Sequence, residues 1–260
     1  MQFNPGFDIK LSIKPMGFQY GSETFGPPVE IRTLDAIRKS LRDPDCIGPE
    51  EVYAIAMDVG KNCHKDILEK KHLLFGAVTY AAGTLGREPV RSQGHIHKKS
   101  TYANGWSTPE VYEIWSGEAI IYMQETGHDN PGRCFAVYAR PGEVVLVPPS
   151  WAHATISANP MEPLSFGAWC DREYGFEYSE VRSHSGLAFF PFLKENNKIV
   201  WEKNEHYLNQ ELIIKSPRIY REFGLTAEKP IYNQFEEDME KFNFVPRPDL
   251  FKDKWERFTP

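Results

Sequence analysis

Residues 94–117 read GHIHKKSTYANGWSTPEVYEIWSG, and a further histidine, His153, stands farther along the chain in PPSWAH. On a β-strand, residues i and i+2 face the same way and lie roughly 6.6 Å apart, so His95 and His97 can converge on one ion. On a helix, the same two side chains would point roughly 200° apart. Together with Glu110 they predict a strand-borne site of three imidazoles and one carboxylate, which leaves positions open on a divalent metal.

The composition predicts a soluble globular protein. The chain has 260 residues, of which 41% are apolar, enough for a substantial core. Its formal charge of −6 argues against nucleic-acid binding, which normally needs a basic face. No apolar run reaches membrane-spanning length and Met1–Lys10 lacks the pattern of a secretory signal, so we expect no membrane association. No C-x-x-C motif or disulfide framework is indicated, which favours a reducing cytoplasm. The cysteines are Cys46, Cys63, Cys134 and Cys170.

Short runs of β-branched and aromatic residues, separated by glycine and proline, predict many short strands. The candidate strands are Val52–Met57, Leu73–Ala81, Val90–His97, Val111–Trp115, Ala119–Gln124, Arg133–Ala139, Val144–Val147, His153–Ser157, Leu164–Trp169, Leu187–Leu193 and Ile199–Trp201. Such a series is typical of a sandwich or barrel. Closing a sheet on itself hides its edges, and a small barrel of this kind can enclose a ligand.

We therefore predict an all-β protein in three parts. Residues 1–50 form an irregular N-terminal arm that packs on the barrel, with a short helix after Thr33 as N-cap. Residues 51–204 form the barrel with the metal site. Residues 205–260 form a partly helical C-terminal extension that packs against the barrel or a partner subunit, and its clearest helical stretch is the acidic segment Gln234–Phe244.

The spacing of these motifs resembles the two sequence signatures of the cupin superfamily. Six residues separate the glutamate from Gly117, and five separate Gly142 from the Pro-Pro pair. The chain departs from the signatures at the twelve-residue segment 98–109, which is several residues longer than usual, at Ser150 in place of glycine and at Ser157 in place of asparagine. None of these departures removes a ligand, and a long loop between strands is tolerable. The resemblance implies a cupin fold, the double-stranded β-helix or jelly-roll barrel.

A longer match, from about Arg32 to Asn204, resembles the cupin-type phosphoglucose isomerases of archaea and some bacteria. The matching stretches are Arg32–Asp35, Glu51–Ile55, Gly83–Glu88, Ser92–His97, Pro141–His153 and Tyr174–Tyr178. The resemblance implies reversible conversion of glucose 6-phosphate to fructose 6-phosphate, a step of glycolysis and gluconeogenesis, at one divalent ion per chain. Aldose–ketose isomerisation moves a proton between adjacent carbons, and Glu110 is the one carboxylate among the ligands, so it is also the candidate base.

The resemblance also implies a phosphate site made of hydroxyl groups and a backbone N–H, which form charge-assisted bonds to a dianion. The matching residues are Tyr53, Ser92, Gly94 and Tyr178, with Tyr112 as a further substrate-binding candidate. The alternative is structural: the tyrosines would line the barrel core and Ser92 would bond to backbone. Four nearby basic residues could add charge, but we interpret them as solvated surface. They are Arg87, Arg91, Lys98 and Lys99.

The chain departs from the family inside the implied substrate cavity. Phe176 stands where the family has a histidine, Cys170 where it has a tyrosine, and Ala77 and Val78 near the place of a threonine. Ring opening or sugar specificity could therefore differ. Four residues could take over a missing role: Glu177, Tyr174, Tyr112 and His184.

Two other functions remain open at this point. One is a different metal-dependent cupin enzyme, either another sugar isomerase or a dioxygenase, and the other is a non-catalytic cupin that binds sugar phosphates. For the ion, the donor set suits several divalent metals, and we favour Fe²⁺ over Mn²⁺ or Zn²⁺ on cellular availability. A homodimer is expected from the family alone.

Overall fold

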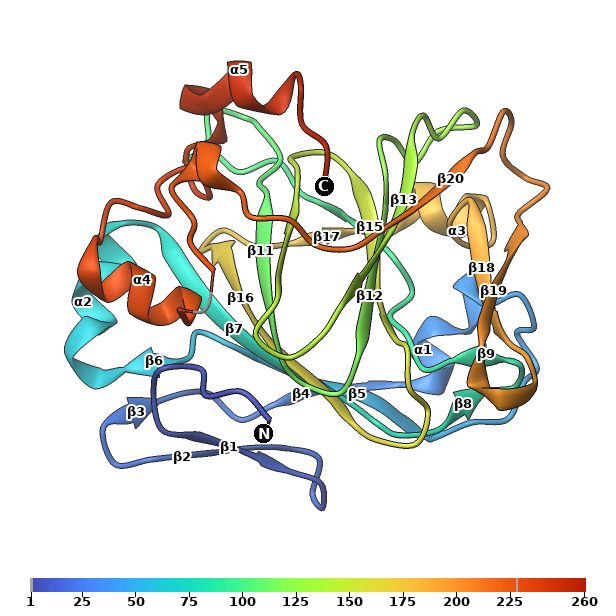
Figure 1. Cartoon of the computed structure of the whole chain (residues 1–260), viewed down its shortest axis with the longest axis horizontal. Helices are drawn as coiled ribbons and strands as arrows, with labels where there is room; N and C mark the ends of the chain where they lie inside the picture. The colour runs from blue at the N-terminus through green and yellow to red at the C-terminus, as the bar shows by residue number, and fades with distance from the viewer. Residues whose placement is uncertain (1, 228) are drawn as a thin grey trace.

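The computed structural model describes residues 2–227 and 229–260, so Met1 of the predicted arm and Glu228 of the predicted extension lie outside the described residues. Two β-sheets face each other and form the body of the molecule (Figure 1). The six-stranded sheet has the order β14 (Val144–Val147), β11 (Glu110–Ser116), β16 (Leu164–Asp171), β7 (Leu73–Tyr80), β5 (Glu51–Met57) and β4 (Glu30–Thr33). The four-stranded sheet has the order β15 (Ala152–Ser157), β12 (Ala119–Gln124), β13 (Cys134–Ala139) and β20 (Leu212–Lys215). All pairings are antiparallel except that of β13 with β20.

Five two-stranded pairs and several short helices in the described part of the chain accompany the two larger sheets. The pairs are β1 (Ile9–Ser12) with β2 (Gly17–Tyr20), β3 (Thr24–Phe25) with β6 (Gly60–Lys61), β8 (Thr84–Leu85) with β9 (Glu88–Pro89), β10 (Ile96–His97) with β17 (Phe176–Glu177), and β18 (Phe189–Leu193) with β19 (Ile199–Lys203). The α-helices are α1 (Leu34–Ile37), α2 (Lys65–Lys70), α3 (Ser179–Ser183), α4 (Ile231–Glu237) and α5 (Lys252–Trp255). The 3₁₀ turns are Arg38–Ser40, Asn62–His64, Glu195–Asn197, Arg221–Phe223 and Pro248–Phe251. None of the helices in the described ranges is long and apolar enough to cross a membrane.

The core lies between the two sheets, and the period-two alternation of each strand decides which side chains enter it. On β11, Tyr112 and Ile114 point into the inner cluster, whereas Val111 and Trp115 belong to a second cluster on the outer face. Every residue of β11 is buried because both faces of the sheet are covered. The predicted all-β class with a cupin barrel is therefore confirmed.

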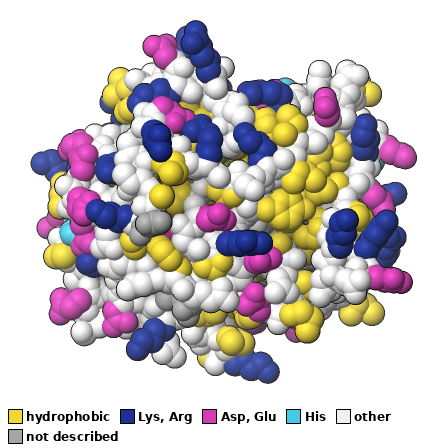
Figure 2. Space-filling model, in the orientation of Figure 1, with side chains coloured by type: hydrophobic (Ala, Val, Ile, Leu, Met, Phe, Trp, Pro, Cys, Tyr) yellow, Lys and Arg dark blue, Asp and Glu magenta, His cyan; other side chains and the backbone are white. Residues whose placement is uncertain are grey.

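The outer face of the six-stranded sheet is covered by the two ends of the chain. Phe7 and Ile9 from the N-terminal region, together with Tyr232 and Phe235 of α4, join the outer cluster, and Trp169 of β16 stacks on Tyr232 at 5.5 Å. Figure 1 shows α4 and α5 on that side, and the β18–β19 hairpin on the opposite side beside the four-stranded sheet. Figure 2 shows the molecule in the same orientation: charges of both signs are interspersed over the face in view, and apolar side chains gather on its right-hand part.

Most predicted strands are confirmed within two residues at each end. The prediction for Val90–His97 is wrong apart from β10, because Gly94 adopts a φ of +87° and interrupts the extended chain. Only single bridges remain on either side of it, at Arg91 and His95. The short helix after Thr33 is confirmed as α1, although the Thr33 side chain makes no capping hydrogen bond.

The helix predicted at Gln234–Phe244 is wrong in its bounds. The helix in this region is α4, which ends at Glu237, and Asp238 then leaves the helical conformation. The Asp238 side chain accepts a hydrogen bond from the Glu240 N–H, a local turn that competes with helix. This turn allows Phe242 to reach the outer cluster.

A buried carboxyl group joins the C-terminal extension to the barrel. Glu113 of β11 is fully buried and accepts hydrogen bonds from the Ile231 N–H at 2.7 Å and from Trp115 Nε1 at 3.1 Å. Burial raises the pKa of Glu113 to about 8, although these two hydrogen bonds lower it. The folded state therefore holds this proton more tightly than the unfolded chain, in which the pKa is near the ordinary value of 4.5.

This linkage predicts that the Glu113 contribution to stability is greatest at acidic pH and is lost as pH rises through about 8. In Glu113→Gln the side chain cannot ionise, so the free energy of unfolding should fall less between about pH 5 and about pH 8 than in the wild type. Urea unfolding across this range measures the difference. Glu118→Gln on the surface is the control, and an identical pH slope in wild type and Glu113→Gln would contradict the prediction.

Candidate metal centre and substrate cavity

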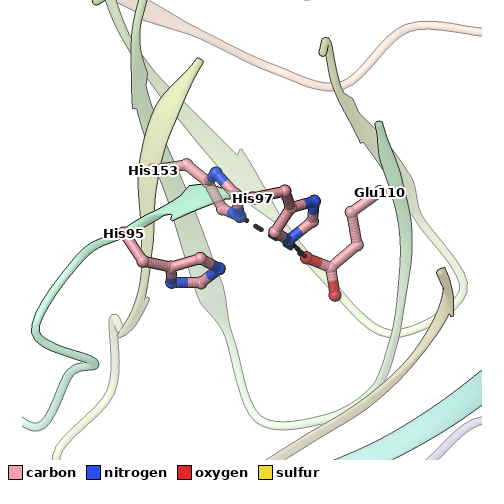
Figure 3. Close-up of side chains that lie close together, drawn as sticks. All are labelled: His95, His97, Glu110 and His153. Carbon is pink, nitrogen blue, oxygen red and sulfur yellow. Dashed lines mark ion pairs between the residues drawn. The ribbon is translucent and has the colours of Figure 1, made fainter. Parts of the chain in front are cut away.

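Three segments bring the predicted ligands together. His95 forms an antiparallel bridge with His153 of β15, and each backbone N–H donates to the carbonyl of the other, at 3.0 and 2.9 Å. His97 lies on β10, two residues farther on, and Glu110 begins β11 in the opposite sheet. Figure 3 shows the four side chains pointing toward one another. The structure therefore joins ligands from both sheets.

The donor atoms are close enough to share one ion. One donor atom from each of the four residues lies within 4.8 Å of the others. The imidazole centroids of His95 and His153 are 4.3 Å apart, and those of His97 and His153 are 4.9 Å apart. Glu110 Oε2 lies 3.2 Å from His97 Nε2 and 3.4 Å from His153 Nε2. These four side chains are arranged so that they could hold a metal ion.

The hydrogen bonds of the imidazoles fit metal binding. His97 Nδ1 lies 2.8 Å from the Thr108 carbonyl and His153 Nδ1 lies 3.0 Å from the Trp151 carbonyl. A carbonyl only accepts, so both Nδ1 atoms donate and the Nε2 lone pairs face the cluster, the usual arrangement for ligating histidines. Among the described residues, the buried Nε2 atoms of His95 and His153 have no hydrogen-bond partner. A divalent ion would satisfy both.

The electrostatics hold Glu110, His95 and His153 in the protonation states that a metal needs. Burial alone would raise the pKa of Glu110, but the imidazoles of His153 and His97 beside it hold it well below its usual range. Burial and the neighbouring imidazoles lower the pKa of His95 well below its usual range, and burial also lowers the pKa of His153. For His97, burial lowers the pKa, but Glu110 raises it more. The result at neutral pH is one carboxylate facing neutral His95 and His153.

Two further donors contact Glu110. The Tyr112 hydroxyl donates to Oε2 at 2.6 Å, and the Cys170 thiol donates to Oε1 at 3.4 Å. Both side chains are buried on the inner faces of β11 and β16. The thiol at the family's tyrosine position thus lies directly against the candidate base.

The predicted substrate residues line one cavity with the candidate ligands His95, His97 and Glu110, and His153 adjoins it. The cavity is lined by Tyr53, Ser92, Tyr112 and Tyr178, whereas Gly94 lies beside it in the backbone before His95. The substituted positions Cys170, Phe176 and Val78 also face the cavity, but Ala77 points to the outer cluster.

The structure adds cavity residues that the sequence did not indicate. They include Tyr80, Thr108, Thr155 and Asp171. Asp171 is notable because it is buried at the end of β16 and neither of its carboxylate oxygens has a hydrogen-bond partner among the described residues. No motif in the sequence marked it, since its position depends on how β16 ends.

Several candidates named above lie away from the cavity. His184 is held by Asp129 at 3.0 Å and stacks on Tyr207, and Glu177 is exposed beside Lys98. Tyr174, in contrast, lines the cavity. The four basic residues named with the phosphate site do not line it; Arg91, for example, is buried in an ion pair with Glu88 at 2.7 Å.

The strand order defines a cupin, and its cluster of three histidines and one glutamate could hold a metal ion. A family model described as "Glucose-6-phosphate isomerase (GPI)" matches residues 35–210. The chain therefore belongs to the glucose-6-phosphate isomerase family and is an enzyme of that family.

Curated relatives agree with this assignment. The glucose-6-phosphate isomerase of Thermococcus litoralis is 29% identical over 171 residues, covering 65% of this chain and 77% of the relative. That of Pyrococcus furiosus is 28% identical over 215 residues, covering 75% of this chain and 97% of the relative. Among solved structures, an oxalate oxidase aligns over 48% of this chain and 53% of its own, with 14% identity and a TM-score of 0.36. That likeness is too low to bear on function.

We propose that His95, His97, Glu110 and His153 bind one divalent ion together. The double substitution His97→Ala/His153→Ala removes two of the four donors, so it should abolish tight metal binding while the barrel stays folded. Elemental analysis after dialysis, with circular dichroism for the fold, measures both. His128→Ala removes an exposed histidine and should keep full metal content. Full stoichiometry in the double variant would rule out the proposed ligand set.

Proposed function

We propose that this protein is a metal-dependent aldose–ketose isomerase that interconverts glucose 6-phosphate and fructose 6-phosphate by proton transfer through an enediol. The observation that carries the proposal is the position of Glu110 among three imidazoles, in a cavity that Tyr53, Ser92 and Tyr178 also line. Family membership supports the substrate. We further propose Fe²⁺ as the ion, with Mn²⁺ or Zn²⁺ as alternatives, and a cytoplasmic homodimer.

The proposed phosphate site consists of hydroxyl donors that line the cavity around Tyr53, Ser92 and Tyr178. Ser92 Oγ accepts a hydrogen bond from the Thr155 N–H at 3.1 Å, which holds the hydroxyl in place at the cavity wall. Tyr53 stacks on Tyr80 at 4.9 Å, which fixes the ring that presents its hydroxyl. We propose that Tyr53, Ser92, Gly94 and Tyr178 hold the phosphate.

Proton transfer falls to Glu110. Its carboxylate is ionised at neutral pH, as a base must be, and it lies where the substrate carbons would meet the imidazole cluster. A divalent ion held there would supply Lewis-acid stabilisation of the negative charge that develops on the enediol oxygens. Met57, Phe166 and Phe176 form an apolar part of the cavity wall, which would limit the access of water to the reacting carbons.

The proposed function is tested by a coupled assay for glucose 6-phosphate and fructose 6-phosphate, run before and after chelation. We expect isomerase activity that is lost on metal removal and regained on addition of Fe²⁺ or Mn²⁺. Oxygen consumption in the same samples is the control for a dioxygenase. Sugar-phosphate turnover that is unaffected by full metal removal, or no turnover in fully metallated protein, would contradict the proposal.

The role of Glu110 as base can be separated from its role as ligand. Glu110→Gln keeps the shape and one oxygen ligand but cannot accept a proton, so kcat should fall by at least ~10²-fold even when metal content is restored. Exchange of the substrate C2 hydrogen with solvent, followed by NMR, should be lost as well. Glu118→Gln on the surface is the matched control. Near-wild-type turnover in fully metallated Glu110→Gln would show that Glu110 is not the base.

A further inference from the structure

Two arginines flank Tyr178 at the edge of the substrate cavity. Arg182 of α3 places its guanidinium carbon 4.8 Å from the centroid of the Tyr178 ring. Arg32 of β4 is the Cα partner of Tyr53 on β5. Cross-strand partners project to the same face of a sheet, so Arg32 lies on the side of the sheet from which Tyr53 lines the cavity. Arg32 and Arg182, which are about 150 residues apart in the sequence, therefore both lie close to Tyr178.

The electrostatics agree with this placement of Arg32. Burial raises the pKa of Tyr178, and the charge and hydrogen bonding of Arg32, with the charge of Arg182, offset part of that rise. The Arg32 side chain is only 19% exposed, and its ion-pair partner is Glu30, whose side chain is 63% exposed. An exposed carboxylate of this kind contributes little and can move into water when a stronger anion arrives.

Arg182 is held in position by the segment that leads to the candidate ligand His95. Its Nε donates to Gln93 Oε1 at 3.1 Å, and Gln93 is buried between Ser92 and Gly94. The terminal guanidinium nitrogens remain beside Tyr178. An arginine that is pre-positioned by one hydrogen bond loses less entropy when it binds an anion.

The cavity itself needs this charge. Among the described residues, no lysine or arginine lines the cavity, whereas two acidic residues, Glu110 and Asp171, do. The four residues implied for the phosphate offer only hydroxyl and backbone donors. Apart from the divalent ion proposed at the imidazole cluster, the phosphate monoester dianion would meet only neutral donors and nearby carboxyl groups. It would then lose more solvation than the hydroxyls return.

We propose that Arg32 and Arg182 form the cationic part of the substrate site and select a phosphate monoester dianion over a neutral sugar. This inference rests on the proposed function, because it assigns the charged end of the same substrate. Both guanidinium groups would contact the phosphate oxygens beside Tyr178, and neither takes part in proton transfer. Arginine suits this role because its planar fork pairs with two phosphate oxygens at once.

The test uses Arg32→Gln, Arg182→Gln and the double variant, each with its metal content measured. For fructose 6-phosphate, we expect KM to rise roughly tenfold or more in each single variant, with kcat changed much less, because a charge-assisted bond is lost from ground state and transition state alike. Calorimetry with inorganic phosphate, on metal-stripped protein, should show a similar loss of affinity. Arg32→Lys and Arg182→Lys should recover part of it.

Arg140→Gln is the matched control, since it removes one positive charge from an exposed side chain that does not line the cavity and should leave KM and phosphate affinity unchanged. Unchanged KM and unchanged phosphate affinity in the folded double variant would overturn the inference. If the glutamine variants fail to fold, the lysine variants decide, because a purely structural role would leave their phosphate affinity at the wild-type value. If wild-type protein binds phosphate through these arginines but does not isomerise sugar phosphates, the proposed function fails and the anion site stands.

Discussion

The site depends on one backbone pairing, the antiparallel bridge between His95 and His153. Each residue donates its N–H to the carbonyl of the other, which fixes two imidazoles on the same side of neighbouring chain segments. His97 follows at the next position with the same orientation. With three imidazoles set by this pairing, Glu110 can approach them only from the opposite sheet, so closure of the barrel is also what completes the candidate metal centre.

Strand β11 links this centre to the outer cover of the barrel. Glu110 and Tyr112 face the cavity, whereas Glu113, three residues after Glu110, faces outward and binds the first turn of α4. The position of β11 is therefore fixed from both sides: by the inner core and by the C-terminal extension. A shift of this strand would move the candidate base and expose the buried carboxyl group of Glu113 at the same time, which gives the extension a physical role in holding the site.

The clustering of the candidate ligands could be predicted from sequence because a period-two pattern places His95 and His97 on one side of a strand, and the spacing to Glu110 and His153 matches a known fold. Most strands were predictable for a related reason, since their ends coincide with glycine and proline. The helix end at Asp238 was not, because a side-chain turn decides it. The position of Arg32 beside the cavity could not be predicted either. Its place follows from cross-strand register with Tyr53, which no local pattern in the sequence encodes.

The two oxygens of Glu110 differ in a way that bears on its two proposed duties. Oε2 faces His97 and His153 and also accepts the hydrogen bond from Tyr112, so it is the oxygen on the side of the imidazole cluster. Oε1 has the Cys170 thiol at 3.4 Å, and a thiol is a weak donor. Its lone pairs are therefore the more available for a proton. A tyrosine hydroxyl in place of Cys170 would be the stronger donor, so the thiol at this position favours a division in which Oε2 serves the metal and Oε1 accepts the substrate proton.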